Sequence, residues 1–277
     1  MQIHIIQTGY FKLDGGAMFG IVPKVLWNRL NPANENNLCN WAMRCLLLVD
    51  GNRRILIDTG IGEKQSEKFF GYYDLNGNES LELSLNAAGY EFADITDVLL
   101  THLHFDHCGG AVRWNKDRTG YLPAFPNATY HLTEGHWNHA NQPNPREKPS
   151  FLAENFMPLQ EAGVLNFVKP GEYLTENIRC RVVGGHTIEM ICPEISLPDK
   201  KIIYCADLIP SSHHIPLNYV MGYDIEPLKT MQEKSLLYQE VMSENALLFF
   251  EHDPVVACTS LQVNEKGQFR AGDAVTL

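Results

Sequence analysis

The sequence contains one stretch that decides the fold, Thr101-His102-Leu103-His104-Phe105-Asp106-His107-Cys108-Gly109-Gly110. It brings three imidazoles and one carboxylate together within six residues, directly after the apolar run 95–100, which predicts a short buried β-strand. Side chains two residues apart leave an extended strand end on the same side, so His102 and His104 are expected to point together. Neutral imidazole and carboxylate are the ligands that borderline divalent metals prefer. The stretch therefore predicts a metal site at the end of this strand.

The residues that frame this stretch are interpreted from their places in turns. Gly109 and Gly110 let the backbone bend sharply before the next element. Cys108 is interpreted as a small residue that fills the tight turn, with a metal ligand or a reactive thiol as the alternative. Asp58, in Asp58-Thr59-Gly60, ends an earlier apolar strand. It either caps its turn or hydrogen-bonds histidines that bind a metal.

Three polar residues elsewhere in the chain also end apolar runs, at His186, Asp207 and His252. The predicted strands before them cover 178–183, 201–205 and 246–250. Because such strand ends meet at the edge of a sheet, each of the three is a candidate metal ligand. Taken singly, each has an ordinary alternative, as a residue that caps or fills a turn.

Five other histidines compete for these roles. His131, His136 and His139 are expected at the surface or in support of the ligands, although His136 and His139 share a helical spacing. His213 and His214 follow a candidate ligand closely, and they are expected to line the pocket.

Composition restricts the class of protein. With 44% apolar and 20% charged residues over 277 positions, the chain is typical of a soluble globular protein. No apolar run approaches the roughly 20 residues that a membrane span needs. The net charge of −11 argues against a nucleic-acid partner, which needs a basic face. Seven scattered cysteines without Cys-x-x-Cys spacing, and no visible signal peptide, predict reduced thiols in a cytoplasmic protein.

Strands and helices alternate along the chain without a linker or repeat, which predicts one α/β domain with two sheets face to face and helices outside. The pair Asp50-Gly51 predicts a hairpin between the strands 43–49 and 54–58. Ser150 is expected to cap a helix, and 246–250 is expected to be the final strand. Further helices are predicted at 80–88, 134–140 and 227–244, and further strands at 2–7, 128–132, 164–168 and 190–196.

Residues 11–41 are rich in glycine, proline and asparagine but also contain many aromatic and aliphatic side chains. The apolar content argues against disorder, and long loops in compact domains are usually functional. The segment is therefore predicted either to cover the active site as a lid or to be an ordinary packed surface loop.

The pattern His-x-His-x-Asp-His, with a strand and Thr101 before it and two glycines after it, resembles the metallo-β-lactamase-fold hydrolases. The resemblance implies a single domain over 1–277 with an αββα fold, which is a sandwich of two mixed β-sheets flanked by helices. It favours hydrogen bonding to ligand histidines as the role of Asp58. The implied site holds two divalent ions, the first bound by His102, His104 and His186, the second by Asp106, His107 and His252, and both by Asp207.

The resemblance also implies a reaction. A hydroxide that bridges the ions would attack an ester-type bond, with Asp106 and Asp207 as catalytic residues. Zinc is the expected metal, with iron, manganese or cobalt as alternatives. The lactonase-like branch, which includes N-acyl-homoserine lactone lactonases and organophosphate hydrolases, is resembled by residues 13–20, 206–210 and 252–254 and by Tyr223-Asp224 with Pro227. A small lactone or carboxylic ester is the expected substrate. The expected pocket residues are Met18, Phe19, Trp27, His213, His214 and Tyr223.

Two departures from the family pattern concern the shape of the loop after His186 and the choice of substrate. Thr187 is followed by Ile188-Glu189-Met190, where relatives often carry Pro-Gly-His, and Pro210 stands where lactonases carry a tyrosine that contacts the lactone. Thioester hydrolases of the glyoxalase II kind share the implied ligands, so they are alternatives together with phosphotriesterases. A persulfide dioxygenase with one iron is the alternative from another class. A true β-lactamase is disfavoured because those relatives lack the bridging aspartate. Either a monomer or a homodimer is compatible with the sequence.

Overall fold

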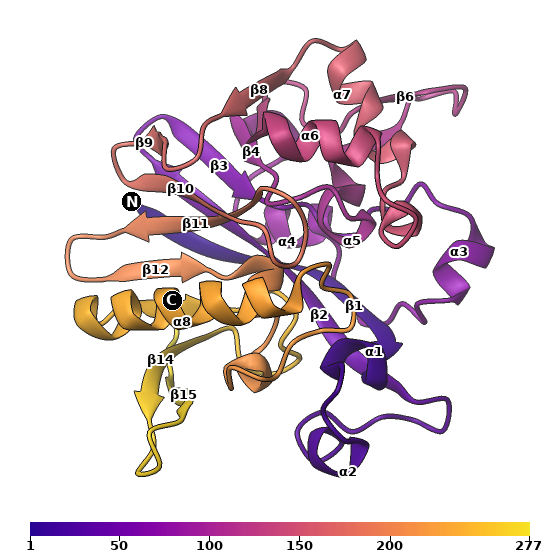
Figure 1. The fold of residues 1–277 in the computed structure, drawn as a ribbon. Helices are drawn as coiled ribbons and strands as arrows, with labels where there is room; N and C mark the ends of the chain where they lie inside the picture. Colours follow the sequence, from indigo (N-terminus) through magenta and orange to yellow (C-terminus); the bar gives the residue numbers. More distant parts are fainter. The chain divides into compact units, whose positions relative to one another are not determined.

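The strands form two large sheets and one small sheet in the computed structural model, which describes all residues, Met1–Leu277 (Figure 1). The chain divides into two units. Unit 1 comprises Met1–Gly9 and Met43–Lys169, and unit 2 comprises Tyr10–Ala42 and Pro170–Leu277. The chain passes from unit 1 into unit 2 within β1 (Gln2–Asp14) and returns within β2 (Leu38–Asp50). Both large sheets are mixed and accompanied by helices, which confirms the predicted α/β class.

The six-stranded sheet has the order β1-β2-β3-β4-β7-β8. Strands β2 and β3 pair antiparallel across the predicted hairpin, with Asp50 opposite Arg53. Strands β3, β4, β7 and β8 are parallel neighbours, so the residues that follow them meet at one edge of the sheet. This edge receives both Asp58 and the loop that begins at Thr101. The bounds are β3 (Arg53–Ile57), β4 (Asp97–Leu99), β7 (Thr129–Thr133) and β8 (Leu165–Val168).

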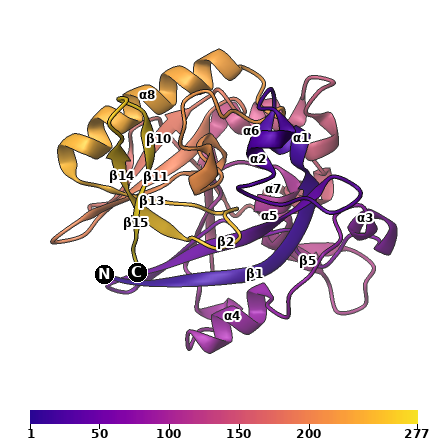
Figure 2. The same ribbon diagram turned by 90° about the horizontal axis from the view of Figure 1, so that it is seen from below.

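Helix α4 (Leu81–Ala87) packs on this sheet through one apolar face. Ser80 begins it by accepting a hydrogen bond from the Leu83 amide, and Leu85 is buried in the core with Ile6. Figure 2 shows α4 beside β1. The other elements of unit 1 are α3 (Glu67–Gly71), α5 (Phe105–Cys108), α6 (Glu134–Asn141), α7 (Met157–Glu161), β5 (Val112–Trp114) and β6 (Tyr121–Pro123).

The seven-stranded sheet of unit 2 has the order β15-β14-β13-β12-β11-β10-β9. Its only parallel pair is β12 and β13, which are joined by the long crossover helix α8 (Pro227–Glu244). Figures 1 and 2 both show α8 running along this sheet, and its buried face contains Thr230, Lys234, Leu237, Tyr238 and Val241. The strands are β9 (Tyr173–Thr175), β10 (Ile178–Val183), β11 (Met190–Ser196), β12 (Lys201–Tyr204), β13 (Leu247–Phe249), β14 (Cys258–Val263) and β15 (Phe269–Ala274).

Two short helices, α1 (Gly15–Phe19) and α2 (Lys24–Trp27), connect β1 to β2. Asp14 caps α1 by accepting a hydrogen bond from the Ala17 amide at 2.8 Å. Phe19 is fully buried and stacks on Trp27, with ring centroids 5.4 Å apart. A Cβ on Gly15 would lie 2.4 Å from the Trp27 ring, so this contact requires glycine. The segment is therefore anchored within unit 2 by buried aromatic packing.

The chain also contains six short 3-10 turns, which carry several of the candidate residues. They are η1 (Phe92–Asp94), η2 (Gly109–Ala111), η3 (Lys148–Ser150), η4 (Ala153–Asn155), η5 (Ala206–Leu208) and η6 (Ser212–His214). None of the helices is long and apolar enough to cross a membrane. All seven cysteines are buried, and none forms a disulfide.

Three predictions of secondary structure are wrong. The segment 11–41 is not one long loop, because β1 extends to Asp14 and β2 begins at Leu38. Ser150 does not cap a helix. Helix α7 begins only at Met157, with Pro158 in its first turn, where a missing amide donor costs no hydrogen bond. The run 246–250 is not the final strand, since β14 and β15 follow it.

Candidate metal centre

The ligand candidates of unit 1 lie in the loop after β4 and on helix α5. His102 and His104 come from the loop, Asp106 and His107 come from α5, and all four are buried. His102 and His104 each offer a ligand atom within 4.8 Å of the other, and their ring centroids lie 4.5 Å apart. His107 Nε2 lies 3.8 Å from Asp106 Oδ2. The structure therefore gathers the four residues of the motif at the edge where the parallel strands end.

Asp58 binds both the start of this loop and one of its histidines. Its Oδ1 accepts the Thr101 amide at 2.8 Å, and its Oδ2 accepts the Thr101 hydroxyl at 2.7 Å. The same Oδ2 lies 3.3 Å from His107 Nδ1. Asp58 has a positive φ of 58°, a backbone conformation that aspartate and asparagine tolerate better than most residues. Of its two interpretations, hydrogen bonding to a candidate ligand histidine is the one that the contacts support.

The loop that follows Asp58 holds the backbone of the motif. The Thr59 amide and hydroxyl both donate to the His107 carbonyl, at 2.8 and 2.9 Å, and the Gly110 amide donates to the Gly60 carbonyl at 3.0 Å. A Cβ on Gly109 would lie 2.0 Å from the Ile61 carbonyl oxygen. The close approach of the two loops therefore requires glycine at position 109.

Hydrogen bonds assign a tautomer to two of these histidines. The Thr101 hydroxyl donates its proton to Asp58, so it must accept one from His102 Nδ1, which lies 3.0 Å away. The Asp58 carboxylate likewise accepts from His107 Nδ1. In both rings Nε2 therefore carries the lone pair that a metal would bind. His104 Nε2 lies 3.7 Å from Glu147 Oε1, which is beyond hydrogen-bond distance, so this contact does not assign a tautomer to His104.

Two contacts on α6 and after it support the candidate ligands; support was one of the roles expected for His136, whereas Glu147 was not predicted. His136 is fully buried, and its Nε2 accepts the Leu103 amide at 2.8 Å, so it fixes the backbone between two candidate ligands. Glu147 is only 3% exposed, and its carboxylate lies 2.7 Å from His139 Nε2. The only sequence signal for Glu147 is Asn144 three residues earlier, whose side-chain oxygen accepts the Glu147 amide at 3.0 Å.

The ligand candidates of unit 2 also follow strand ends. His186 follows β10, Asp207 lies on η5 after β12, and His252 follows β13. All three are buried. One oxygen of the Asp207 carboxylate lies 3.1 Å from His186 Nε2, and its other oxygen lies 3.2 Å from His252 Nε2. The parallel pairing of β12 with β13 brings Asp207 and His252 to the same edge of the sheet.

The partners of these two histidines show that a cation fits between them and Asp207. His186 Nδ1 lies 2.9 Å from an oxygen of Asp224, and His252 Nδ1 lies 2.8 Å from the Ala42 carbonyl oxygen. Because both partners accept hydrogen bonds, Nδ1 carries the proton in each ring and Nε2 carries a lone pair. That lone pair faces a carboxylate oxygen, and two acceptors at such a distance repel unless a proton or a metal ion lies at them. Imidazole nitrogen with carboxylate oxygen suits a borderline divalent metal.

Helix α8 holds the loop that carries His186. The Gly184 and Gly185 amides donate to the Glu233 carboxylate at 2.8 and 3.0 Å. A Cβ on Gly185 would lie 2.3 Å from the Thr230 hydroxyl oxygen, so the loop approaches the helix closely only with glycine there. Thr230 in turn donates to Asp224 at 2.7 Å. Helix α8 therefore fixes the backbone just before His186.

Comparison with known families decides the family of the chain. A model of the metallo-beta-lactamase superfamily matches residues 44–252, which is more than half of the sequence. The chain belongs to the metallo-β-lactamase superfamily. The resemblance predicted from the motif around His104 is therefore confirmed.

Several solved structures share the fold over nearly the whole chain. A probable metal-dependent hydrolase from Staphylococcus aureus is 26% identical, with a TM-score of 0.88 over 99% of this chain and 98% of its own. AidC, a dizinc quorum-quenching lactonase, is 20% identical, with a TM-score of 0.78 over 99% and 95%. An N-acyl homoserine lactone hydrolase is 19% identical, with a TM-score of 0.69 over 91% and 93%. Family and fold together support a metal-dependent hydrolase.

The predicted pocket residues of this metallo-β-lactamase-fold chain divide into two groups. Four of them pack inside unit 2, since Met18, Phe19, Trp27 and His214 are all buried. Burial lowers the pKa of His214 to about 3 despite its hydrogen bond to Met18, so the imidazole stays neutral. In contrast, Tyr223 is 38% exposed, and His213 is partly exposed.

The apolar side chains that a ligand could reach in the N-terminal segment are different ones. Ile21 is 92% exposed, Val25 is 65% exposed, and Leu26 and Leu30 are also exposed. They lie on and around α2, near the buried residues Met18, Phe19 and Trp27 that are predicted to line the pocket. Burial within a segment cannot be read from composition alone, so the exposed apolar residues differ from the predicted ones.

Two further interpretations from the sequence are resolved by burial. His131 is not at the surface, since it is 5% exposed and its Nε2 lies 2.9 Å from Asp97 Oδ1 within the sheet. Cys108 fills the turn as expected, and its thiol donates to the Leu103 carbonyl at 3.3 Å. Burial raises the pKa of Cys108 to about 12, so the thiol stays protonated and is a poor nucleophile.

Proposed function

We propose that the protein is a dinuclear-metal-dependent hydrolase that cleaves an ester-type bond, with a lactone or carboxylic ester as substrate. One observation carries this proposal. Asp207 turns one carboxylate oxygen to each of two histidine Nε2 atoms, and both rings hold their proton on the opposite nitrogen. A carboxylate with one oxygen per histidine is suited to binding two cations at once.

We assign the ligands by adding the family pattern to these tautomers. His102 and His186 would bind the first ion through Nε2, together with His104. His107 and His252 would bind the second ion through Nε2, together with the Asp106 carboxylate. Asp207 would bind both ions. The support for this assignment is that each of the four histidines other than His104 has a hydrogen-bond partner on the ring nitrogen that is not assigned to metal.

Two divalent ions at this position would lower the pKa of a bound water and stabilise the negative charge that develops on the substrate oxygen. The other roles belong to side chains. Asp106 is buried at the start of α5 and would pass a proton to the leaving alcohol. Asp58, Asp224 and the Ala42 carbonyl would keep their histidines in the ligating tautomer.

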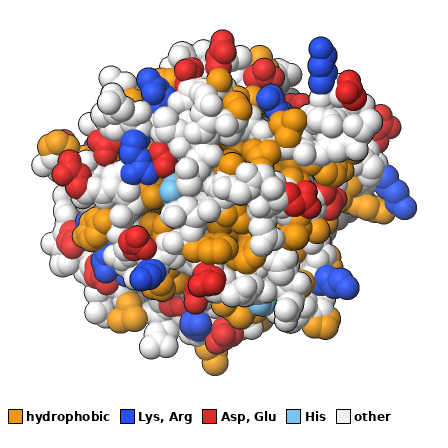
Figure 3. Space-filling view, turned by 90° about the horizontal axis from the view of Figure 1, so that it is seen from above, with side chains coloured by type: hydrophobic (Ala, Val, Ile, Leu, Met, Phe, Trp, Pro, Cys, Tyr) orange, Lys and Arg blue, Asp and Glu red, His pale blue; other side chains and the backbone are white.

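The substrate proposed here is a small molecule with an apolar arm. On the face shown in Figure 3, acidic and basic side chains are interspersed among hydrophobic ones, so this face offers no continuous basic surface for a nucleic acid. Tyr223 is exposed and is our candidate for the hydrogen-bond donor that lactonases supply from the position of Pro210. The exposed apolar residues on α2 are our candidates for contact with an acyl chain.

The first prediction tests the reaction class. The purified protein should contain two zinc-like ions per chain and should hydrolyse a lactone or a carboxylic ester, and chelation should abolish turnover. The measurement is elemental analysis together with turnover of a homoserine lactone, a thioester and a paraoxon-type ester. One iron per chain with oxygen uptake would instead favour the dioxygenase, and activity that survives metal depletion would reject the mechanism.

The second prediction tests the acyl-chain contact. Ile21→Ser together with Leu26→Ser should lower kcat/KM for a long-chain lactone about tenfold more than for a short-chain one, because about two buried methylene groups are lost. Both side chains are exposed in the free protein, so the change should not unfold it. Leu228→Ser on α8 is the matched control, because Leu228 is 80% exposed. Equal losses on both substrates would show that Ile21 and Leu26 do not contact the acyl chain, and residues 11–41 would then not act as a lid.

A further inference from the structure

Lys64 has a buried ammonium whose single hydrogen bond ends on the candidate metal loop. It follows Gly62 on the loop after β3, is 6% exposed, and donates from Nζ to the carbonyl of Gly109. Gly109 directly follows α5, the helix that carries Asp106 and His107. All of these residues belong to unit 1.

An ammonium is a costly group to place here. No carboxylate lies within ion-pair distance of Lys64, and desolvation lowers its pKa to about 8. A methionine of similar length would fill the same space without this penalty, so packing alone does not account for a lysine. What the ammonium adds is a positive charge and a donor at a backbone carbonyl.

The end of α5 is where such a charge is useful. The helix has four residues, which is too short to be stable by itself, so contacts from outside must fix it. A cation near the carbonyl end of a helix is favourable because the last carbonyls carry partial negative charge. Thr59 already holds the His107 carbonyl, and Gly60 holds the Gly110 amide. Lys64 holds the carbonyl between them.

We propose that Lys64 is a positioning residue for the metal centre, which fixes α5 so that Asp106 and His107 present their ligand atoms together. This inference rests on the proposed function, because it assumes that these two residues bind a metal. Lys64 would act through the backbone of Gly109 and would touch neither metal nor substrate.

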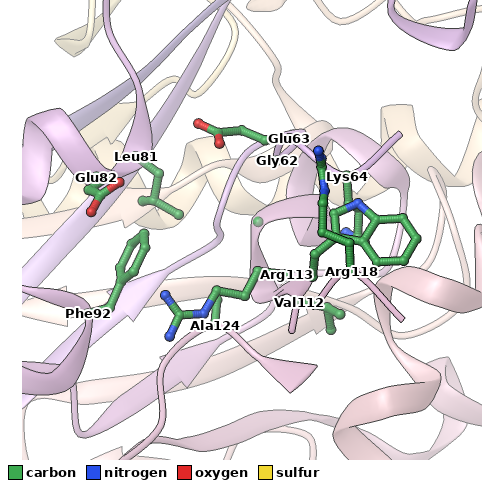
Figure 4. Close-up of a pocket in the computed structure, with 12 residues that line it drawn as sticks. Gly62, Glu63, Lys64, Leu81, Glu82, Phe92, Val112, Arg113, Arg118 and Ala124 are labelled. Atoms are coloured by element: carbon green, nitrogen blue, oxygen red, sulfur yellow. The ribbon is translucent and has the colours of Figure 1, made fainter. Parts of the chain in front are cut away.

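A cavity beside Lys64 makes the proposal testable by chemical rescue. Lys64 lines a cavity of about 290 Å³ together with Gly62, Gly110 and Trp114 (Figure 4). The exposed side chains of Arg113 and Arg118 also line it, so the cavity is open to solvent. Removing the Lys64 side chain would extend this cavity toward the Gly109 carbonyl. A small alkylammonium ion could then occupy the place of the missing group.

The third prediction concerns Lys64→Ala and Lys64→Met. Both should weaken the affinity for one of the two metal ions by about 10- to 100-fold, the size of effect seen when groups that orient ligands are removed. The metal-free Lys64→Met variant should melt at the wild-type temperature or above it. Propylammonium should restore metal affinity in Lys64→Ala only, because the methionine fills the cavity. Tetramethylammonium, which has no N–H donor, should not restore metal affinity in either variant.

The experiment is competition of zinc or cobalt against a chelator, with thermal melting of the metal-free chains. Lys68→Met is the matched control, since Lys68 is exposed on the neighbouring α3. Wild-type metal affinity in both Lys64 variants would overturn the proposal. The proposal would also be overturned if the melting temperature of the Lys64 variants fell equally with and without metal, because Lys64 would then have a purely structural role. If the wild-type chain bound no metal at all, the proposed function itself would fail instead.

Discussion

Asp207→Asn is expected to remove at least one metal ion and to lower kcat/KM by about 1,000-fold or more, equivalent to ~4 kcal/mol of transition-state stabilisation. Each carboxylate oxygen faces one histidine Nε2, at 3.1 and 3.2 Å. Asparagine keeps one oxygen but replaces the other with an NH2 group, which donates and cannot bind a cation. The lost negative charge also weakens the binding of two neighbouring cations.

The measurement for Asp207→Asn is elemental analysis and steady-state kinetics on the same preparation. Asp199→Asn, in the exposed turn between β11 and β12, removes the same charge and should keep both ions and full activity. His252→Ala should also lose one ion and most turnover, because it removes the histidine on one side of Asp207. A variant at Asp207 that keeps two ions and wild-type turnover would show that this carboxylate does not bridge them.

Asp58→Asn is expected to have the second largest effect, lowering kcat/KM by about 10² to 10⁴-fold through the wrong tautomer of His107. The asparagine oxygen can still accept the Thr101 amide. Its NH2 group, however, would donate to His107 Nδ1, and the ring would then carry its proton on Nε2, where the metal should bind. Asparagine tolerates the positive φ of this position, so the backbone should be unchanged.

The control for Asp58→Asn lies at the other end of the same sheet. Asp97 is also buried and binds a histidine, His131, at 2.9 Å, but that histidine is no candidate ligand. Asp97→Asn should lower the free energy of unfolding by about 1–3 kcal/mol without changing metal affinity. Chelator competition and chemical denaturation of both variants separate the two effects. Equal metal affinity in the Asp58 and Asp97 variants would contradict the tautomer argument.

The parts of the fold that the sequence predicts well are those with a strong local signal. Helix α8 has the predicted bounds of 227–244, because its apolar side chains recur at helical spacing over five turns of chain. The β2–β3 hairpin was predicted from Asp50-Gly51. By contrast, β15 contains Gly272 and Asp273, which disfavour strands, and it is held by pairing with β14. A strand that depends on its neighbour in this way has no local sequence pattern from which it could be predicted.

The residues of the candidate site likewise divide into those with a local sequence signal and those without one. His102, His104 and Asp207 could be found because each follows an apolar strand, β4 in the six-stranded sheet and β12 in the seven-stranded sheet, and each of these strands has a parallel neighbour that ends at the same edge of its own sheet. Glu147 and Asp224 could not be found in this way. Their histidine partners, His104 and His186, lie 43 and 38 residues away, and the contacts depend on how loops fold back on the sheet. The aromatic residues Phe19 and Trp27 were assigned to the pocket, although they pack inside the N-terminal segment.

The most direct test of the central claim is a crystal structure of the zinc-loaded protein with anomalous scattering measured at the zinc edge. We expect two anomalous peaks per chain, with zinc–nitrogen distances of about 2.0–2.1 Å. One peak should be bonded to His102, His104 and His186, the other to Asp106, His107 and His252, and Asp207 should contact both. A map in which His186, Asp207 and His252 point away from the peaks at the 102–107 cluster would contradict the account.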